Sequence, residues 1–149
     1  MKLPHPIEIS LKDFFLNGRF DYLEPGQDMA YVRSNFADAN CESDMGNGFH
    51  IWQYGDIELH FDGDILMMIY CDYFDLIDGG PALKIDRWVL ENSASLTLSK
   101  MLNILCNEGA DFMVHHDTSL KQSSVYISKS RVLLYFDAND EYIEPERYG

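Results

Sequence analysis

Hydrophobic and polar residues alternate most clearly between residues 49 and 73. This stretch predicts three antiparallel strands separated by the pairs Gly55-Asp56 and Asp62-Gly63. Glycine in the first position suits a type II′ turn, and Asp-Gly is a favoured type I′ pair. Two-residue turns fix the register of the strands, so the residues of each face can be deduced. The predicted core face contains Trp52, Tyr54, Ile57, Leu59, Phe61, Leu66, Met68 and Tyr70, and Gly55 and Gly63 shape the turns.

The opposite face of this meander is mixed in character. It carries Ile51, Gln53, Glu58, His60, Ile65, Met67, Ile69 and Cys71. The third strand, residues 65–73, is apolar on both sides, which predicts a central strand that is covered at least in part on both faces. His60 comes two residues after Glu58 and is interpreted as a solvated surface histidine beside that carboxylate.

Apolar residues at helical spacing predict three helices, over residues 10–17, 28–36 and 97–107. Further strands are predicted over 83–90, 112–116, 125–128 and 132–136, the last two joined at Lys129-Ser130. The polar run 37–48 is predicted to be a loop, and the acidic tail from residue 137 to be peripheral. The predicted fold is a single α+β domain over residues 1–149. It consists of an antiparallel β-sheet meander with two or three helices packed on one face.

The charge balance narrows the class of partner. The 149 residues carry a formal net charge of −14 at pH 7, which disfavours nucleic acid and anionic membranes because both attract basic surfaces. Residues 55–86 hold eight acidic side chains and one basic one, which is half of that net charge. We therefore predict an interface for a basic protein, formed by Asp56, Glu58, Asp62, Asp64, Asp72, Asp75 and Asp78. Charge alone equally fits a solvated acidic rim that serves solubility. Charge reversal at Asp56 or Asp64 is expected to spare folding and to weaken binding.

Candidate catalytic groups are sparse. The hairpin carboxylates are explained by turn chemistry, and no calcium-loop spacing, phosphate-binding loop or nucleophile elbow is present. His115 and His116 are adjacent on a predicted strand, so they point to opposite faces and do not share a metal easily. We expect no catalytic residue, no metal and no cofactor. An alternative is a small-ligand or metal-binding enzyme that uses the mixed face around Glu58, His60 and His115.

The three cysteines favour a reduced compartment. Cys41, Cys71 and Cys106 are widely spaced and odd in number, which is typical of a chain without a disulfide framework. Cys71 and Cys106 occupy apolar positions and are predicted to be buried. The first ten residues lack the apolar segment of a secretory signal, so a cytoplasmic location is expected.

Residues 51–61, IWQYGDIELHF, are followed by Asp62-Gly63. They resemble the W-x-Y-G-D-x-E-x-x-F pattern of small bacterial immunity proteins, which accompany polymorphic or contact-dependent growth-inhibition toxins. Upstream, Gly26, Asp28, Val32 and Phe36 align with a further pattern of that group, G-M-S-x-x-x-V-x-x-x-L-G-x-P, whereas Gln27, Ala37 and Ala39 depart from it.

This resemblance implies a protein that binds a cognate toxin C-terminal domain and neutralises it by occlusion. The acidity favours a basic nuclease as that toxin, and a monomer or weak dimer is expected. A third possibility is an adaptor protein with an unrelated partner.

Overall fold

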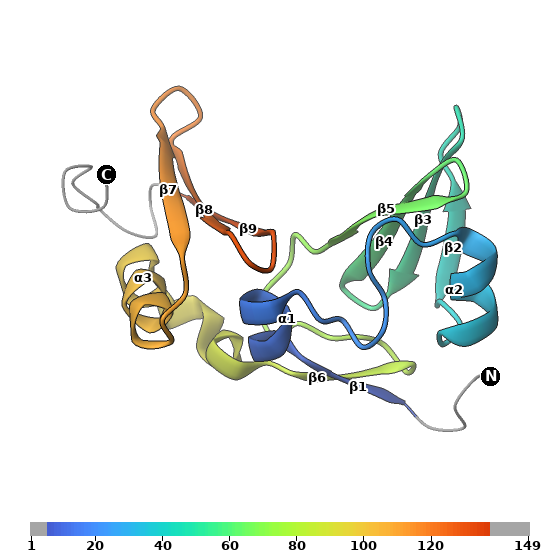
Figure 1. The fold of residues 1–149 in the computed structure, drawn as a ribbon, viewed down its shortest axis with the longest axis horizontal. Coiled ribbons are helices and arrows are strands. Elements are labelled where there is room, and N and C mark those ends of the chain that lie inside the picture. The colour runs from blue at the N-terminus through green and yellow to red at the C-terminus, as the bar shows by residue number, and fades with distance from the viewer. Residues whose placement is uncertain (1–5, 138–149) are drawn as a thin grey trace. The chain divides into compact units, whose positions relative to one another are not determined.

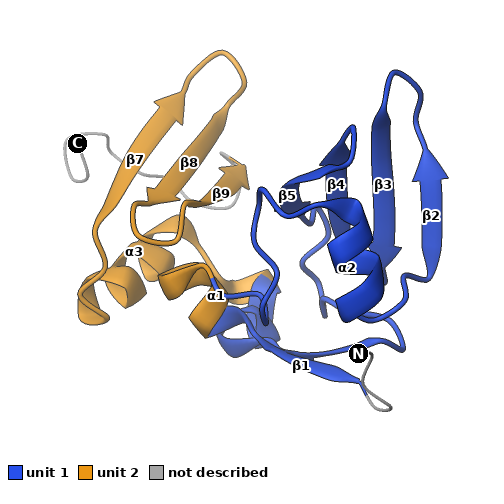
Figure 2. Cartoon of the chain, turned by 45° about the vertical axis from the view of Figure 1, so that its right-hand side comes forward, with its two compact units in different colours: residues 1–12, 19–93 blue, residues 13–18, 94–149 orange. Residues whose placement is uncertain are grey.

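The computed structural model describes residues 6–137, which form two compact units (Figure 1, Figure 2). Unit 1 contains residues 19–93 and the chain up to Lys12. Unit 2 contains Asp13–Gly18 and the chain from Ala94 onward. Helices and antiparallel sheets together confirm the predicted α+β class. The acidic tail that was predicted to be peripheral lies outside the described residues.

The described helices are α1 (Leu11–Asn17), α2 (Met29–Asn35), the 3-10 helix η1 (Trp88–Ser95) and α3 (Leu98–Asn107). The described strands are β1 (Ile7–Ser10), β2 (Cys41–Asp44), β3 (Phe49–Tyr54), β4 (Ile57–Asp62), β5 (Ile65–Tyr70), β6 (Leu83–Asp86), β7 (Phe112–Asp117), β8 (Gln122–Ile127) and β9 (Val132–Asp137). The three predicted α-helices are confirmed to within about one residue at each end.

The strands form three sheets. A four-stranded antiparallel sheet in unit 1 has the order β2-β3-β4-β5, and β1 pairs with β6 in a separate parallel pair. Unit 2 contains a three-stranded antiparallel sheet, β7-β8-β9. The predicted meander is therefore the larger part of the four-stranded sheet, to which β2 adds a strand that was predicted to be loop.

The core of unit 1 lies between the four-stranded sheet and α2, which Figure 2 shows across one face of that sheet. Tyr54 pairs with Ile57 and Trp52 with Leu59, as predicted. The Phe36 ring, at the end of α2, lies 5.5 Å from the Tyr54 ring in an edge-on arrangement. Six of the eight predicted apolar core side chains are buried, namely Trp52, Tyr54, Ile57, Leu59, Phe61 and Leu66.

The other two, Met68 and Tyr70, were wrongly assigned to the core. The β4–β5 ladder pairs Phe61 with Leu66 but His60 with Met68, so Met67 is an extra residue in a β-bulge. The bulge moves Met68 to the opposite face, where its side chain is exposed. The turn of this hairpin is Gly63-Asp64, one residue later than predicted, because Asp62 pairs with Ile65.

The prediction that the third strand is central was also wrong. In the four-stranded sheet β5 is an edge strand that pairs with β4 alone. Its apolar side chains pack into the core on one face of the sheet and are exposed to solvent on the other. Apolar strands of this kind usually indicate burial on both faces, and that rule does not hold here.

The predicted strand over residues 83–90 ends early, at Asp86. Trp88 has a φ of +51°, which is incompatible with an extended strand. The carboxylate of Asp86 accepts a hydrogen bond from the Trp88 backbone N–H at 3.2 Å, which closes a local turn. The chain then continues as the 3-10 helix η1.

Unit 2 combines α3 with the three-stranded sheet. The Thr97 hydroxyl accepts a hydrogen bond from the Lys100 backbone N–H at 3.3 Å and caps the start of α3, as its position predicts. The apolar face of α3 is buried through Leu98, Met101, Leu102 and Leu105, and β8 contributes Val125 and Ile127. The predicted connection at Lys129-Ser130 is confirmed as the β8–β9 turn.

Replacing Tyr54 with phenylalanine is expected to lower the free energy of unfolding by about 1–2 kcal/mol. The Tyr54 hydroxyl donates to the Ala37 carbonyl at 2.7 Å in a buried setting, and the substitution leaves that carbonyl without its partner. Burial also raises the pKa of Tyr54 well above its ordinary value of 10.0. The stability that Tyr54 contributes is therefore present below pH 10 and is lost as the pH rises above it.

Urea denaturation at pH 7 and at about pH 10.5 measures both effects. The Tyr54→Phe variant should be less stable than the wild type at pH 7 and should lose less stability between the two pH values. Tyr73, which is exposed, provides a matched control, because Tyr73→Phe should change neither quantity. Equal behaviour of the two variants would contradict the prediction.

Candidate interaction surface

The face of the four-stranded sheet that is turned away from α2, here called the outer face, presents apolar side chains to solvent. The strand register places Met68 and Tyr70 on this face, opposite His60 and Glu58, and Ile65 opposite Asp62. Ile65, Met67, Met68 and Tyr70 are between 38% and 45% exposed. Apolar side chains gathered on one strand of a sheet are typical of a surface that binds another macromolecule.

His60 lies beneath this apolar layer, and the prediction that it is a solvated surface histidine was wrong. Only 8% of the residue is exposed, because the Phe49 ring packs against the imidazole at 5.5 Å and the Tyr70 ring at 5.1 Å. Nε2 of His60 donates to a carboxylate oxygen of Glu58 at 2.7 Å. Nδ1 is buried and has no hydrogen-bond partner among the described residues. Glu58 and His60 therefore form a polar pair within the outer face.

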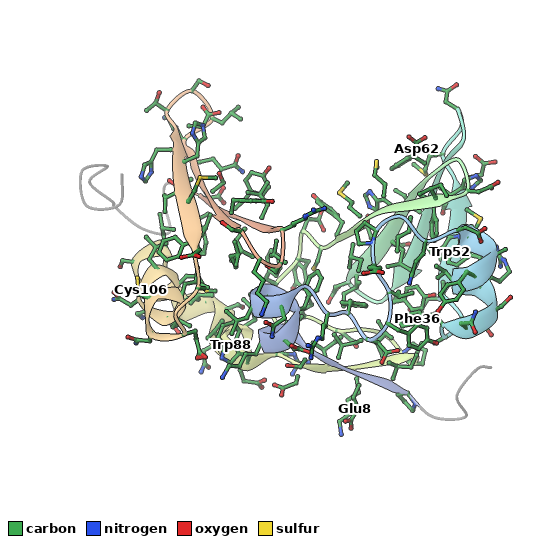
Figure 3. All side chains as sticks on the ribbon, in the orientation of Figure 1. Glu8, Phe36, Trp52, Asp62, Trp88 and Cys106 are labelled. Atoms are coloured by element: carbon green, nitrogen blue, oxygen red, sulfur yellow. The ribbon has the colours of Figure 1, made fainter. Side chains whose placement is uncertain are left out.

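Carboxylates surround the outer face. Asp62 and Asp64 lie at the β4–β5 turn, and Asp72 and Asp75 follow β5; all four are exposed. Figure 3 shows Asp62 at the turn end of β4. No lysine or arginine occurs between Arg33 and Lys84, whereas ten acidic residues do. This surface therefore has a strongly negative potential, because this stretch of the sequence has no basic side chain to offset its carboxylates.

Asp56, by contrast, is part of the scaffold. Its carboxylate accepts a hydrogen bond from the Asp78 backbone N–H at 2.8 Å, and its own N–H donates to the Asp78 carbonyl at 2.7 Å. The Asn40 side chain accepts from the Gly55 N–H at 2.7 Å, and the Asp78 carboxylate accepts from Gly80 at 2.9 Å. A lysine at position 56 cannot accept the hydrogen bond from the Asp78 N–H, so charge reversal at Asp56 is now expected to lower stability as well.

The residues of the enzyme alternative are divided between the two units. A hydrogen bond joins Glu58 and His60 in unit 1, whereas His115 lies on β7 in unit 2, opposite Ser124. His116 is turned to the other face of its sheet, where its Nδ1 is 2.8 Å from the Ser123 hydroxyl. Within residues 6–137, no group of three histidine, cysteine or acidic side chains could hold a metal ion.

An open hollow of about 280 Å³ between α2 and β2–β3 has no counterpart in the sequence pattern. It is lined by Met29, Arg33, Glu42, Ser43, Asp44, His50 and Trp52. The Arg33 guanidinium forms two hydrogen bonds of 2.9 Å with the Glu42 carboxylate and lies 4.6 Å from the Trp52 ring centre. Since the segment containing Glu42 was predicted to be loop, its approach to Arg33 could not be expected. The one guanidinium of the hollow is thus already neutralised.

Cys71, just after β5, is partly buried and its thiol donates to the Tyr73 carbonyl at 3.1 Å. Burial raises the pKa of this thiol to about 11. Cys41 and Cys106 are exposed, which for Cys106 contradicts the predicted burial. Cys106 lies on α3 beside the buried Leu105, and its side chain faces solvent.

Alkylation with iodoacetamide at pH 8 is therefore expected to label Cys41 and Cys106 well before Cys71, because the thiolate is the reacting species. Peptide mass spectrometry over a time course measures the three rates. In denatured protein the three rates should converge, which provides the control. If Cys71 were labelled fastest in the folded protein, the partly buried environment assigned to its thiol would be wrong.

Comparison with protein-family models, curated proteins and solved structures found no match to this chain. Among the helices within residues 6–137, none has the length and apolar character needed to cross a membrane.

Proposed function

We propose that this chain is an immunity protein that neutralises a basic toxin domain by binding it through the outer face. The observation that supports this most strongly is an exposed apolar layer on β5 surrounded by carboxylates, within a stretch that lacks lysine and arginine. Interfaces of this composition combine an apolar centre that excludes water with a charged rim that selects the partner. Neutralisation by occlusion requires no catalytic group.

The charge distribution supports a basic protein as the partner. Asp62, Asp64, Asp72 and Asp75 are exposed, so they can meet cations without being extracted from a folded core. A concentrated negative potential accelerates encounter with a basic surface and repels acidic ones. A basic nuclease has the required charge, because it must itself attract nucleic acid.

The proposal places the protein in the cytoplasm. The three cysteines are free in the structure, and unpaired thiols are typical of a reducing compartment. A nuclease toxin acts on nucleic acid in that same compartment, so an inhibitor is needed there. The resemblance of residues 51–61 to small immunity proteins agrees with this location.

The proposal is tested by co-expressing the chain with the protein encoded by the neighbouring gene. We expect co-purification of the two proteins and protection of the host cells from the toxin. The association rate should fall markedly between about 50 mM and about 500 mM salt, since screening shortens the reach of exposed charges. Absence of both a complex and protection would refute the proposal. A complex without protection would instead favour an adaptor protein.

A further inference from the structure

The three-stranded sheet of unit 2 has an exposed face of different character. Strand pairing aligns Met113, Tyr126 and Leu133 in one row across the sheet, and His115, Ser124 and Tyr135 in the next. We call these two rows the unit 2 face. Met113, Leu133 and Tyr135 are between 44% and 65% exposed. Met113, Tyr126 and Leu133 are cross-strand neighbours, and Tyr135 lies two positions after Leu133 on the same face of β9, so these four side chains form one patch.

The electrostatics of this face differ from those of the outer face of unit 1. Residues 13–18 and 94–137 contain five acidic and four basic side chains, a net charge of −1, whereas residues 6–12 and 19–93 have a net charge of −11. The described part of unit 2 therefore lacks the potential that would attract a basic partner. For the same reason, two unit 2 faces can approach each other without strong repulsion.

The charges at the two ends of β9 are opposite in sign. Arg131 precedes the strand, with Lys129 in the same turn, and Asp137 ends it. Asp137 lies in the ladder row that contains Asp117 and Gln122. Arg131 and Asp137 are both exposed. The face thus has a basic end, an apolar centre and an acidic end along a single strand.

We propose that the unit 2 face binds a second copy of this chain, so that the protein forms a two-fold symmetric dimer. A two-fold axis perpendicular to β9, passing between Leu133 and Tyr135, places Arg131 of each copy opposite Asp137 of the other. The same operation brings Leu133 of each copy against Tyr135 of the other. The surface is complementary to itself in both charge and apolar contact, which a symmetric interface requires.

This dimer uses a different set of residues from the proposed toxin interface, because the two surfaces belong to different units. The outer face of unit 1 is unsuited to self-association, since its carboxylates would meet like charges. The unit 2 face combines exposed aromatic and apolar side chains with little net charge, so it can bury them against an identical surface.

Analytical ultracentrifugation of the full chain, from about 1 µM to about 500 µM, tests the dimer. We expect reversible dimerisation of the wild type. Arg131→Asp and Asp137→Arg should each raise the dissociation constant about tenfold or more, since each places like charges in contact. The double variant Arg131→Asp/Asp137→Arg should restore dimerisation to within about threefold of the wild type. Tyr135→Glu should abolish it.

Circular dichroism spectra and thermal melts verify that every variant is folded. Met68→Glu, on the outer face of unit 1, is the matched control and should leave the dissociation constant unchanged. A wild type that stays monomeric over the whole range would overturn the inference. Single charge variants that dimerise normally, or a double variant without restored dimerisation, would also overturn it. So would a Tyr135→Glu variant that dimerises normally but loses the basic partner, which would assign this face to the toxin.

Discussion

Replacing Gly55 with alanine is expected to lower the free energy of unfolding by about 3 kcal/mol or more. Gly55 has a φ of +61°, a conformation that costs a residue with a Cβ atom about 1–2 kcal/mol. A Cβ atom here would also overlap the Asp78 carbonyl and the Gly80 backbone nitrogen, both of which are backbone atoms. The clash can be relieved only by separating the β3–β4 turn from the 78–80 loop, which breaks the hydrogen bonds between Asp56 and Asp78.

Gly63 provides a closely matched control. It is also the first residue of a two-residue hairpin turn and has the same φ of +61°. A Cβ atom added at Gly63 would meet no other atom within 4 Å. Gly63→Ala should therefore cost only the conformational term, about 1–2 kcal/mol. The difference between the two variants in the free energy of unfolding, measured by urea denaturation, separates the cost of backbone strain from the cost of steric overlap. Equal losses of stability would show that the contact with the 78–80 loop is unimportant.

Replacing Asp62 and Asp64 together with lysine is expected to weaken binding to the basic partner by about 100-fold at low salt. Both side chains are exposed at the β4–β5 turn, so stability should change little. The reversal replaces attraction with repulsion at the rim of the outer face, and most of the effect should appear in the association rate. Surface plasmon resonance at several salt concentrations measures the rate constants, and the difference from the wild type should shrink as salt rises.

The double variant Glu108→Lys/Asp111→Lys is the control for total charge. Glu108 and Asp111 are exposed residues of unit 2, and their replacement changes the net charge by the same amount. If position matters, this variant should retain most of the wild-type affinity. Equal weakening in both double variants would indicate that the partner responds to overall charge and not to the outer face.

The sequence predicted the meander well where short turns constrained it. The pairing of Trp52 with Leu59 follows from the Gly55-Asp56 turn alone. Beyond the second turn the prediction failed, because a bulge at Met67 shifts the register and turns Met68 outward. Alternation of apolar residues cannot reveal a bulge when the residues on both sides of it, Met67 and Met68, are equally apolar.

The pairing of β1 with β6 and the strand β2 were not predicted, the first because the partners are distant in sequence and the second because its composition is polar. β1 and β6 pair across more than seventy residues of sequence, and such long-range pairing has no local signal. β2 consists of Cys41, Glu42, Ser43 and Asp44 and is mostly exposed at a sheet edge, so it shows no apolar alternation. Edge strands of this kind are commonly polar.

The candidate site was also predicted only in part, because the contacts that distinguish its carboxylates are made with residues distant in sequence. Acidic residues in the turns look alike in the sequence, but the structure separates them. Asp56 and Asp78 hydrogen-bond to backbone N–H groups of the 78–80 loop, whereas Asp62 and Asp64 remain exposed at the β4–β5 turn. The contact that ties up Asp56 spans 22 positions of sequence. Composition therefore indicated where the charge is concentrated, and only the fold shows which carboxylates can meet a partner.

The outer edge of β5 is crossed by the segment that leads into α2. The Gly26 N–H donates to the Leu66 carbonyl at 2.8 Å, and the Leu66 N–H donates to the Gln27 carbonyl at 2.8 Å. Together with the bulge at Met67, these bonds deny a foreign strand a regular hydrogen-bonding edge. An apolar edge strand without such protection would be prone to aggregation. The proposed partner would therefore have to contact side chains on the face of the sheet, and extension of the sheet by an added strand is disfavoured.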